Sequence, residues 1–423
     1  FRKFKDRRKR STPLMKVTLL STFDTFGGAG VAASRLLKAL STQSVEATML
    51  VHQQTGHQVC VKAVGNQKVA FARFAAERAL FWPHERSKQV RFAFSPARVG
   101  VDISQHPAVR EADVLHLHWI NFGFLSLSDL EKLIGLGKPI IWTLHDMWTF
   151  TGGCHYAGSC LGYRVCCGNC PLLKRPAPHD LSHQVWLKKK AILTSANITY
   201  VTCSEWLASL AQLSGLLRGK EVLSIPNPID NQLFKPTDKN LAKKALGLPP
   251  DKQYLLFAAQ NVQDERKGFR YFKEAIQQSS LPDSVEILTF GKNQHQDFEG
   301  FPIKIHHLGS LSNVDTIVQA YQAASVFVIP SLEDNLPNTV MESLACGTPV
   351  VAFQTGGIPE MVQHLHNGFI AAQRSAQELA QGIEWVLTKA DYEQVSNFAV
   401  QTVNQNFAET IVAQRYRQLY DAK

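Results

Sequence analysis

The sequence lacks the hallmarks of several protein classes. Its 423 residues contain no uninterrupted run of about 18 apolar residues, which excludes a transmembrane helix. Charged residues make up only 19% of the chain and apolar residues 45%, a balance that excludes a disordered protein and suffices for large cores. There is no repeat of fixed period and no low-complexity tract, and the length predicts two or three domains.

Positive charge is concentrated at one end of the chain. The net charge is +10, and residues 1–14 hold seven Lys and Arg against one Asp. The remainder is close to neutral, so we expect no nucleic-acid partner. Residues 1–14 are expected to form a basic tail, either solvated or docked on the inner membrane surface, where each cation contributes about 1 kcal/mol. Lys16 interrupts the apolar stretch after this tail, so we expect no secretory signal and a cytoplasmic protein, at most peripheral on the membrane.

Cysteine is scarce, but five of the eight cysteines lie within residues 154–170. Eight are too few for a disulfide scaffold of this length. Four of the five, with a Cys-x-x-Cys pair among them, could form a closed tetrahedral zinc site that pins a long loop. This candidate set is Cys154, Cys160, Cys167 and Cys170. Reduced packing cysteines and disulfides are the two alternatives.

Short β-branched runs alternate with amphipathic helical stretches from Met15 onward, and the alternation occurs twice. It predicts an α/β protein of two doubly wound, Rossmann-like domains that face a central cleft. The expected strands are 17–22, 45–51, 113–119, 139–146, 198–204 and 220–227, then 254–260, 285–291, 303–309, 324–331 and 348–354. We expect domains at 15–235 and 236–404, a helix at 405–423 that could pack back on the first domain, and a long loop at 79–104.

A glycine-rich turn follows the first expected strand. Gly28, Ala29 and Gly30 would let the backbone approach a phosphate at the start of a helix expected from about Val31. The alternative is a tight turn that only packs the helix on the strand. The cluster does not match the Gly-x-Gly-x-x-Gly fingerprint, which disfavours a dehydrogenase.

A second helix start follows the apolar strand at 324–331. Pro337 suits a first helical turn, so the helix N-terminus would point toward the strand end and the cleft. Asp334 lies in the loop and Glu342 about one turn into the helix. Both could hydrogen-bond polyhydroxylated rings beside a phosphate held by the amides at Asn338 and Thr339. Two solvated acids at a helix start are the alternative.

This region resembles the family 4 retaining glycosyltransferases of the GT-B fold. Their pattern of an acid, seven intervening residues, a second acid and an Ala-x-Gly-x-Pro-Val turn occurs here as Asp334, Glu342 and residues 345–350. The resemblance implies that Asp334, in place of the usual glutamate, contacts the hydroxyls of the donor sugar. It also implies that Glu342 contacts the nucleotide ribose. Glu333 is the rival of Asp334 for the first role.

Other motifs extend the resemblance over nearly the whole chain after Met15. Arg266 and Lys267 resemble the Lys-Gly motif that clamps the donor diphosphate, although an arginine that the family carries a few residues earlier is replaced by Gln260 and Asn261. Gly357 lies in a loop similar to one that lines the donor site. The alternative for Arg266 and Lys267 is an exposed basic turn, and the alternative for Gly357 is a plain strand-to-helix turn.

The cysteine-rich segment narrows the resemblance to bacterial exopolysaccharide glycosyltransferases of the colanic-acid type. His145 ends an expected strand, where the family places a histidine near the reacting sugar. A purely structural histidine is the alternative, and His116 and His118 on the preceding strand are expected to be structural.

The resemblance implies a retaining hexosyltransferase. It would move a hexose from a nucleotide-diphosphate sugar to a glycan or lipid-linked acceptor in bacterial exopolysaccharide or lipopolysaccharide biosynthesis. The first domain would be the acceptor side, and the second would bind the nucleotide sugar. No Asp-x-Asp motif is present, so we expect metal-independent catalysis with no cofactor beyond the structural zinc. A nucleotide-sugar epimerase on the same fold and a non-catalytic sugar-nucleotide-binding protein are the alternatives.

Overall fold

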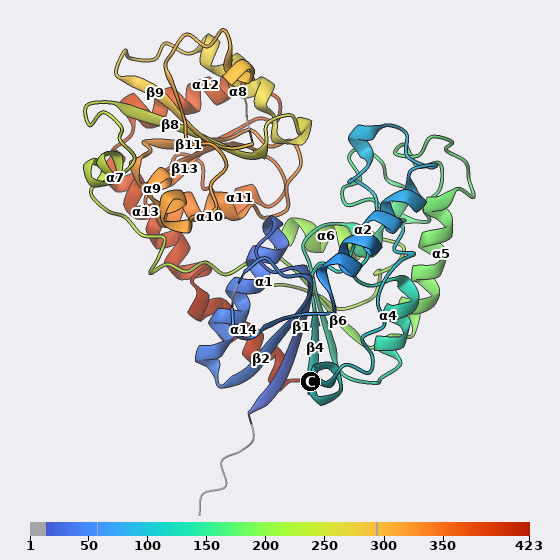
Figure 1. Ribbon diagram of the computed structural model, residues 1–423. Coiled ribbons are helices and arrows are strands. Elements are labelled where there is room, and N and C mark those ends of the chain that lie inside the picture. Colours follow the sequence, from blue (N-terminus) through green and yellow to red (C-terminus); the bar gives the residue numbers. More distant parts are fainter. Residues whose placement is uncertain (1–13, 57, 293–294) are drawn as a thin grey trace, which may run out of the picture.

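The computed structural model describes residues 14–56, 58–292 and 295–423, which form two α/β domains (Figure 1). The N-terminal sheet has the order β3-β2-β1-β4-β5-β6-β7, and the C-terminal sheet has the order β10-β9-β8-β11-β12-β13; all neighbouring strands are parallel. The strand order reverses between β1 and β4 and between β8 and β11, where doubly wound sheets bind ligands. The predicted fold class is confirmed.

The strands of the first sheet are β1 (Met15–Phe23), β2 (Val45–Gln53), β3 (Val61–Ala63), β4 (Val114–Leu117), β5 (Ile140–Leu144), β6 (Ile198–Thr202) and β7 (Val222–Ser224). Those of the second sheet are β8 (Gln253–Asn261), β9 (Val285–Lys292), β10 (Ile305–His307), β11 (Val326–Ile329), β12 (Val350–Phe353) and β13 (Gly368–Ala371). Two short outer strands, β3 and β13, were not predicted, because neither contains a long apolar run.

The helices of the N-terminal domain are α1 (Gly27–Leu40), α2 (Gln67–Phe81), α3 (Pro107–Glu111), α4 (Leu127–Ile134), α5 (Leu181–Thr194) and α6 (Glu205–Leu213). They are followed by α7 (Lys239–Ala245), α8 (Phe269–Gln278), α9 (Val314–Ala323), α10 (Asn338–Ala345), α11 (Ile358–Met361), α12 (Ala376–Glu384), α13 (Tyr392–Asn406) and α14 (Glu409–Asp421). The region expected to be a loop from residue 79 begins instead after Phe81, where α2 ends.

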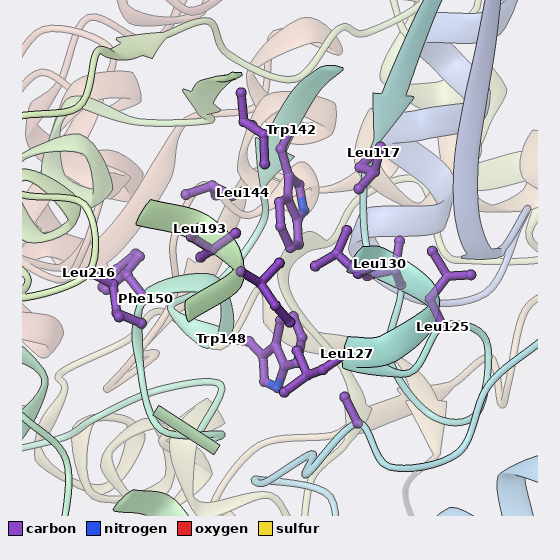
Figure 2. Packing of buried hydrophobic residues seen from close by; sticks show 14 of the residues in the cluster. Leu117, Leu125, Leu127, Leu130, Trp142, Leu144, Trp148, Phe150, Leu193 and Leu216 are labelled. Atoms are coloured by element: carbon purple, nitrogen blue, oxygen red, sulfur yellow. The ribbon is translucent and has the colours of Figure 1, made fainter. Parts of the chain in front are cut away.

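Burial on both faces explains the apolar strands. Every residue of β4, β5 and β6 is buried, because helices cover both sides of a parallel sheet. Trp142 of β5 packs with Leu130 of α4 and Leu193 of α5 in a large core, and Trp148 from the next loop fills the same layer (Figure 2). This core holds the carboxyl end of β5 in place, and His145 follows directly.

The chain crosses between the domains twice. After β7 it runs into the C-terminal domain, and after α13 it returns so that α14 packs beside α1 (Figure 1). The two crossings are bonded to each other: the Ile229 amide donates to the Phe407 carbonyl at 2.9 Å, and the Glu409 amide donates to the Ile229 carbonyl at 3.0 Å. The α14 hydroxyl of Tyr420 lies 2.7 Å from His116 Nδ1 inside the N-terminal core.

The basic tail predicted at residues 1–14 lies, apart from Leu14, outside the described residues. Among the helices that the structure does describe, none is both long enough and apolar enough to cross a membrane.

Candidate functional site between the domains

The first turns of α1 and α10 meet across the domain interface. Asn338, the first residue of α10, donates from Nδ2 to the carbonyl of Gly28 at 3.0 Å. Its Oδ1 accepts from Nδ2 of Asn227 at 3.2 Å. Asn227 lies in the segment that leads from β7 into the C-terminal domain. The predicted helix starts therefore come together, so that two sets of helix N-terminal amides converge on one place.

The glycine-rich turn differs from the prediction in one respect. Helix α1 begins at Gly27 and not near Val31, so Gly28, Ala29 and Gly30 form its first turn. Gly28 is exposed, Ala29 is half-buried and Gly30 is buried. A Cβ at Gly30 would lie 2.9 Å from the carbonyl oxygen of Phe23, so this glycine permits close packing of α1 on β1. Gly28 is thus the glycine of the cluster that faces the other domain.

Lys267 and Asp334 form the central ion pair of the site. The Lys267 Nζ donates to Asp334 Oδ2 at 2.8 Å, and both side chains are largely buried. Lys267 follows β8 and Asp334 follows β11, the two strands at the switch point of the second sheet. Gly268 makes this approach possible: its φ is +67°, and a Cβ there would lie 1.9 Å from the Pro330 carbonyl. The structure therefore brings two predicted site residues together.

Arg266 points to a different partner. It forms a bidentate ion pair with Asp264, with an Nη2–Oδ2 distance of 2.7 Å. Its guanidinium carbon also lies 5.4 Å from the ring centroid of Tyr156, which comes from the cysteine-rich segment of the other domain. This arrangement is a cation–π contact across the cleft. Tyr156 lies within the cysteine-rich segment 154–170, but its residue type alone indicated no role there.

Glu342 is buried in α10 and is held from two sides. Its Oε1 accepts from Nη2 of Arg35 in α1 at 2.6 Å, and its Oε2 accepts from the hydroxyl of Tyr321 in α9 at 3.1 Å. The Arg35–Glu342 ion pair connects the two domains, because the partners come from opposite sides of the interface. The sequence analysis did not assign Arg35, since a lone arginine in an amphipathic helix carries no motif.

Thr339 and Gly357 complete the predicted donor side. Thr339 is half-buried in the first turn of α10. Gly357 is buried, and its amide donates to the Asn335 carbonyl at 2.7 Å. A Cβ at Gly357 would lie 2.7 Å from Cβ of Ser204, so this glycine allows the loop to pack tightly on the N-terminal domain. The glycine therefore supports the interface and does not line open space.

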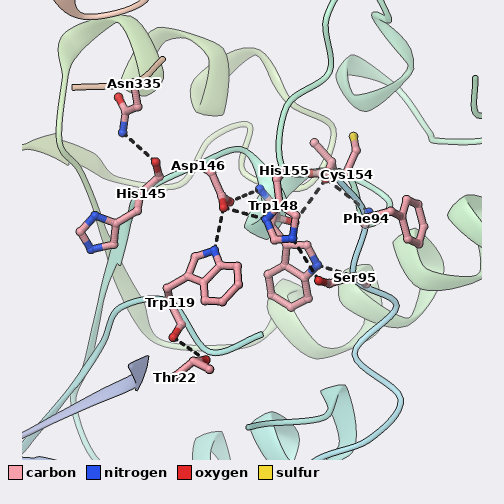
Figure 3. Close-up of polar contacts among 12 residues, drawn as sticks. Thr22, Phe94, Ser95, Trp119, His145, Asp146, Trp148, Cys154, His155 and Asn335 are labelled. Atoms are coloured by element: carbon pink, nitrogen blue, oxygen red, sulfur yellow. Dashed lines mark hydrogen bonds and ion pairs between the residues drawn. The ribbon is translucent and has the colours of Figure 1, made fainter. Parts of the chain in front are cut away.

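His145 follows β5 and has both ring nitrogens engaged within its own domain. Nε2 lies 3.0 Å from His118 Nδ1, and Nδ1 lies 3.5 Å from Cys203 Sγ. Its carbonyl accepts from Nδ2 of Asn335, the residue after Asp334, at 3.2 Å (Figure 3). Burial lowers the pKa of His145 to about 4, so the imidazole is uncharged near neutral pH. His116 and His118 are buried, as expected of structural histidines.

A polar network next to His145 escaped the sequence analysis. Asp146 accepts from Trp119 Nε1 at 2.8 Å and from the Trp148 amide at 2.8 Å, and it pairs with His155 Nδ1 at 2.7 Å (Figure 3). Burial alone would raise the pKa of Asp146, but the charge of His155 and these hydrogen bonds together hold it below its usual value. Ser95 bonds the other His155 nitrogen at 3.0 Å. Only the proximity of Asp146 to His145 in the sequence could have indicated this role.

The predicted zinc site is not supported. In the part of the chain that the structure describes, no group of three or more His, Cys, Asp or Glu side chains is arranged to hold a metal. All eight cysteines are free thiols. Burial raises the pKa of Cys167 to about 12 and that of Cys170 to about 11, and it raises the pKa of Cys154 further. The free thiols favour the alternative of reduced packing cysteines for the set Cys154, Cys160, Cys167 and Cys170.

Comparison with known proteins agrees with this geometry. The family described as "Glycosyl transferases group 1" matches residues 252–389, which contain Lys267, Asp334 and Glu342. The protein named "Putative colanic acid biosynthesis glycosyl transferase WcaC" from Escherichia coli strain K12 is 26% identical over 314 residues, which cover 69% of this chain and 73% of that protein. These findings show that the chain resembles the group 1 glycosyltransferases. The predicted resemblance to family 4 is therefore confirmed.

Two further comparisons cover most of the chain. An uncharacterized glycosyltransferase of Methanocaldococcus jannaschii, MJ1607, is 22% identical over 76% of this chain and 87% of its own. The crystal structure of Anabaena Alr3699/HepE in complex with UDP-glucose superimposes with a TM-score of 0.66 at 16% identity, covering 97% of this chain and 100% of that one. The second comparison shows the GT-B fold.

Proposed function

We propose that this glycosyltransferase moves a hexose, with retention of configuration, from a nucleotide-diphosphate sugar to a glycan or lipid-linked acceptor in bacterial surface polysaccharide biosynthesis. The observation that carries the proposal is the Lys267–Asp334 ion pair beside the first turn of α10, at the interface of the two domains. The colanic acid relative and the UDP-glucose complex of the Anabaena protein support this choice of substrates.

The donor diphosphate would lie between Lys267, Arg266 and the first amides of α10 at Asn338 and Thr339. Fixed cations and helix dipoles stabilise the charge that grows on a leaving diphosphate without reorganisation. Asp334 holds Lys267 in position and would accept hydrogen bonds from the hydroxyls of the sugar. The exposed first turn of α1 at Gly28 would contribute further amides from the opposite side.

Glu342 would bind the ribose with the lone pairs that Arg35 and Tyr321 leave free. A carboxylate oxygen can accept two hydrogen bonds, and each oxygen of Glu342 accepts one from the protein. The ion pair with Arg35 would thereby couple ribose binding to closure of the two domains.

In the proposed reaction, the bond between the anomeric carbon and the diphosphate oxygen breaks, and a bond from an acceptor hydroxyl forms on the same face. The acceptor proton passes to the departing phosphate, and a nucleoside diphosphate is released. The N-terminal domain would bind the acceptor beside His145, whose uncharged ring makes no ion pair with the donor.

A screen of nucleotide sugars tests the proposal. We expect one uridine- or guanosine-diphosphate hexose to raise the melting temperature, because a bound ligand stabilises the native state by mass action. The same donor, radiolabelled, should then transfer its sugar to extracted lipid-linked glycans. Lys267→Ala should weaken both effects strongly, whereas Lys244→Ala, which removes an exposed lysine of α7, should leave them unchanged.

Two outcomes would replace the proposal. Release of an isomerised sugar nucleotide from donor alone would indicate an epimerase. Donor binding without transfer to any extracted glycan would indicate a non-catalytic binding protein.

A further inference from the structure

A series of hydrogen bonds runs from the domain interface into the N-terminal domain, and its direction is fixed at the interface. The Gly28 carbonyl can only accept, so the atom of Asn338 that bonds it is the amide nitrogen, and Asn338 Oδ1 must accept from the next residue. That donor is Nδ2 of Asn227, which leaves Oδ1 of Asn227 as an acceptor. Sγ of Cys203 lies 3.1 Å from this oxygen, whereas its other acceptor, the Leu144 carbonyl, is at 3.6 Å. Burial raises the pKa of Cys203, so the thiol keeps its single proton and donates it to Asn227.

This direction determines which nitrogen of His145 carries the proton. Cys203 has given its proton away, so toward His145 Nδ1, at 3.5 Å, the sulfur can only accept, and Nδ1 must be protonated. The ring is uncharged and holds one proton, so Nε2 of His145 is bare. Nδ1 of His118 lies 3.0 Å from it and must therefore be the donor. Burial lowers the pKa of His118 well below its usual value, so this ring is also uncharged and its own Nε2 is bare.

The bare nitrogen of His118 needs a donor of its own. His118 is 3% exposed and Asn121 is 2% exposed. Neither His118 Nε2 nor Asn121 Nδ2 has a hydrogen-bond partner among the residues that the structure describes. Both residues line one small cavity of about 10 Å³, which is enough room for a single water molecule. A water can donate to the ring nitrogen of His118 and accept from the amide of Asn121 at the same time.

We propose that His118 is a positioning residue that fixes His145 in its Nδ1-protonated tautomer, and that a buried water between His118 and Asn121 completes the hydrogen-bond series. Both ring nitrogens of His145 are then used within the protein. The ring is held in one orientation and has no lone pair left to take a proton from an acceptor hydroxyl. The tautomer follows from the contacts alone, whereas any effect of His118 on turnover rests on the proposed function.

The neighbouring His155 shows why His145 depends on such a series. Nδ1 of His155 faces the Asp146 carboxylate at 2.7 Å, and a carboxylate accepts a proton donor directly. His145 precedes Asp146 in the sequence but makes no hydrogen bond to it. Its tautomer is set instead by neutral groups, and the last of them, Asn338, belongs to the other domain. Closure of the domains therefore gives the series its direction.

Nuclear magnetic resonance tests the tautomer without any substrate. The full chain is labelled at its histidine ring nitrogens, and two-bond nitrogen–proton correlations near neutral pH separate protonated from bare nitrogens. We expect His145 and His118 each to be protonated at Nδ1 and bare at Nε2, and His145→Gln identifies the His145 signals by their loss. A proton on Nε2 of His145 in the wild type would overturn the proposal.

Variants of His118 separate positioning from packing. His118→Leu removes the donor, so His145 should lose its single tautomer and give a mixture. His118→Asn can place an amide N–H near the position of Nδ1 and should restore the wild-type tautomer. His52→Gln is the matched control, because it replaces another buried histidine of the same domain, and it should leave the His145 signals unchanged. An unaltered tautomer in His118→Leu would overturn the proposal.

Cys203 provides a second route if the leucine variant does not fold. Cys203→Ser keeps a group that donates to Asn227 and accepts from His145, so the tautomer should be retained. Cys203→Ala removes both hydrogen bonds and should give the mixture. The same tautomer in the serine and alanine variants would overturn the proposal.

Turnover and crystallography complete the test. We expect His118→Leu to lower kcat about tenfold or more without changing the KM for donor, because a displaced group near the reacting atoms slows the chemical step. His118→Asn should recover part of this loss, and equal kcat values in all three proteins would overturn the positioning role. The predicted tautomer in a wild type that transfers no sugar would support the assignment and count against the proposed function. A crystal structure of the wild type should show the water beside His118 and Asn121, and an empty cavity would overturn that part of the proposal.

Discussion

The two sides of the interdomain site differ in how they carry charge. On the C-terminal side, Lys267 and Asp334 remain paired ions, and Glu342 reaches across to Arg35. On the N-terminal side, burial keeps His145 and His118 uncharged, and the acid Asp146 is enclosed by donors of its own domain. An anionic diphosphate suits the charged side, and a neutral sugar or lipid-borne glycan suits the other. The following experiments test this division.

Breaking the charged connection between the domains should have the largest effect. Glu342→Ala leaves Arg35 buried without its partner, and we expect the free energy of unfolding to fall by about 3 kcal/mol. The double variant Arg35→Met/Glu342→Met removes both charges and should recover much of that stability in urea denaturation. Transfer activity should stay at least tenfold low in the double variant, because the ribose ligand is still missing. Full activity there would show that Glu342 is only structural.

Removing the cation of the charged side should affect catalysis more than stability, because Lys267 is more exposed than Arg35 and Glu342. Lys267→Ala is expected to slow transfer about a hundredfold, because one preorganised cation at a leaving group is worth about 2.7 kcal/mol. Lys267→Arg should retain part of the activity. The measurement is initial rate with saturating acceptor, and wild-type rates in Lys267→Ala would place the donor elsewhere.

The buried, uncharged histidines of the N-terminal domain should make its stability sensitive to acid. Burial lowers the pKa of His52 to about 4 and that of His116 to about 3, below the unfolded value of about 6.5. The unfolded state therefore binds more protons in this window, so stability is complete above pH 6.5 and is lost as the pH falls toward 4. Each histidine contributes a slope of up to about 1.4 kcal/mol per pH unit.

Urea denaturation followed by tryptophan fluorescence measures this slope, since six of the seven tryptophans lie in the N-terminal domain. His52→Gln should reduce the slope of stability against pH by the contribution of one histidine, up to about 1.4 kcal/mol per pH unit. The glutamine amide can still bond the Ala70 carbonyl, but it does not titrate. His179→Gln, which replaces an exposed histidine, is the control and should leave the slope unchanged. An unaltered slope in His52→Gln would contradict the assignment.

Removing the cation–π contact between Tyr156 and Arg266, which lie on opposite sides of the site, should produce the smallest effect. Tyr156→Ala removes the ring under Arg266, and a cation–π contact of about 1 kcal/mol predicts about a fivefold rise in the KM for donor. Tyr156→Phe keeps the ring and should behave like wild type. Equal KM values in all three proteins would mean that Arg266 does not bind the donor.

Periodic patterns made the fold predictable, and chain-local motifs made part of the site predictable. The central strands, the domain pair and the Lys267 and Asp334 loops were found because each depends on neighbouring residues in the sequence. Residues that only folding brings together could not be predicted. Arg35 and Glu342 pair although 307 positions separate them, and Asn335 donates to the His145 carbonyl of the other domain. The zinc prediction found no support for the same reason, since cysteine spacing does not specify where buried thiols point.

The paired crossings at Ile229 and Phe407 restrict how the halves can separate. A single linker would allow the domains to rotate freely. Here two adjacent connecting segments are hydrogen-bonded to each other and form one two-stranded hinge. A hinge of two bonded segments permits bending about one axis and resists rotation of one domain about the length of the linker. We therefore expect the domains to open by a hinge motion about an axis near Ile229. Each closure would return Asn338 to the same contact with Gly28.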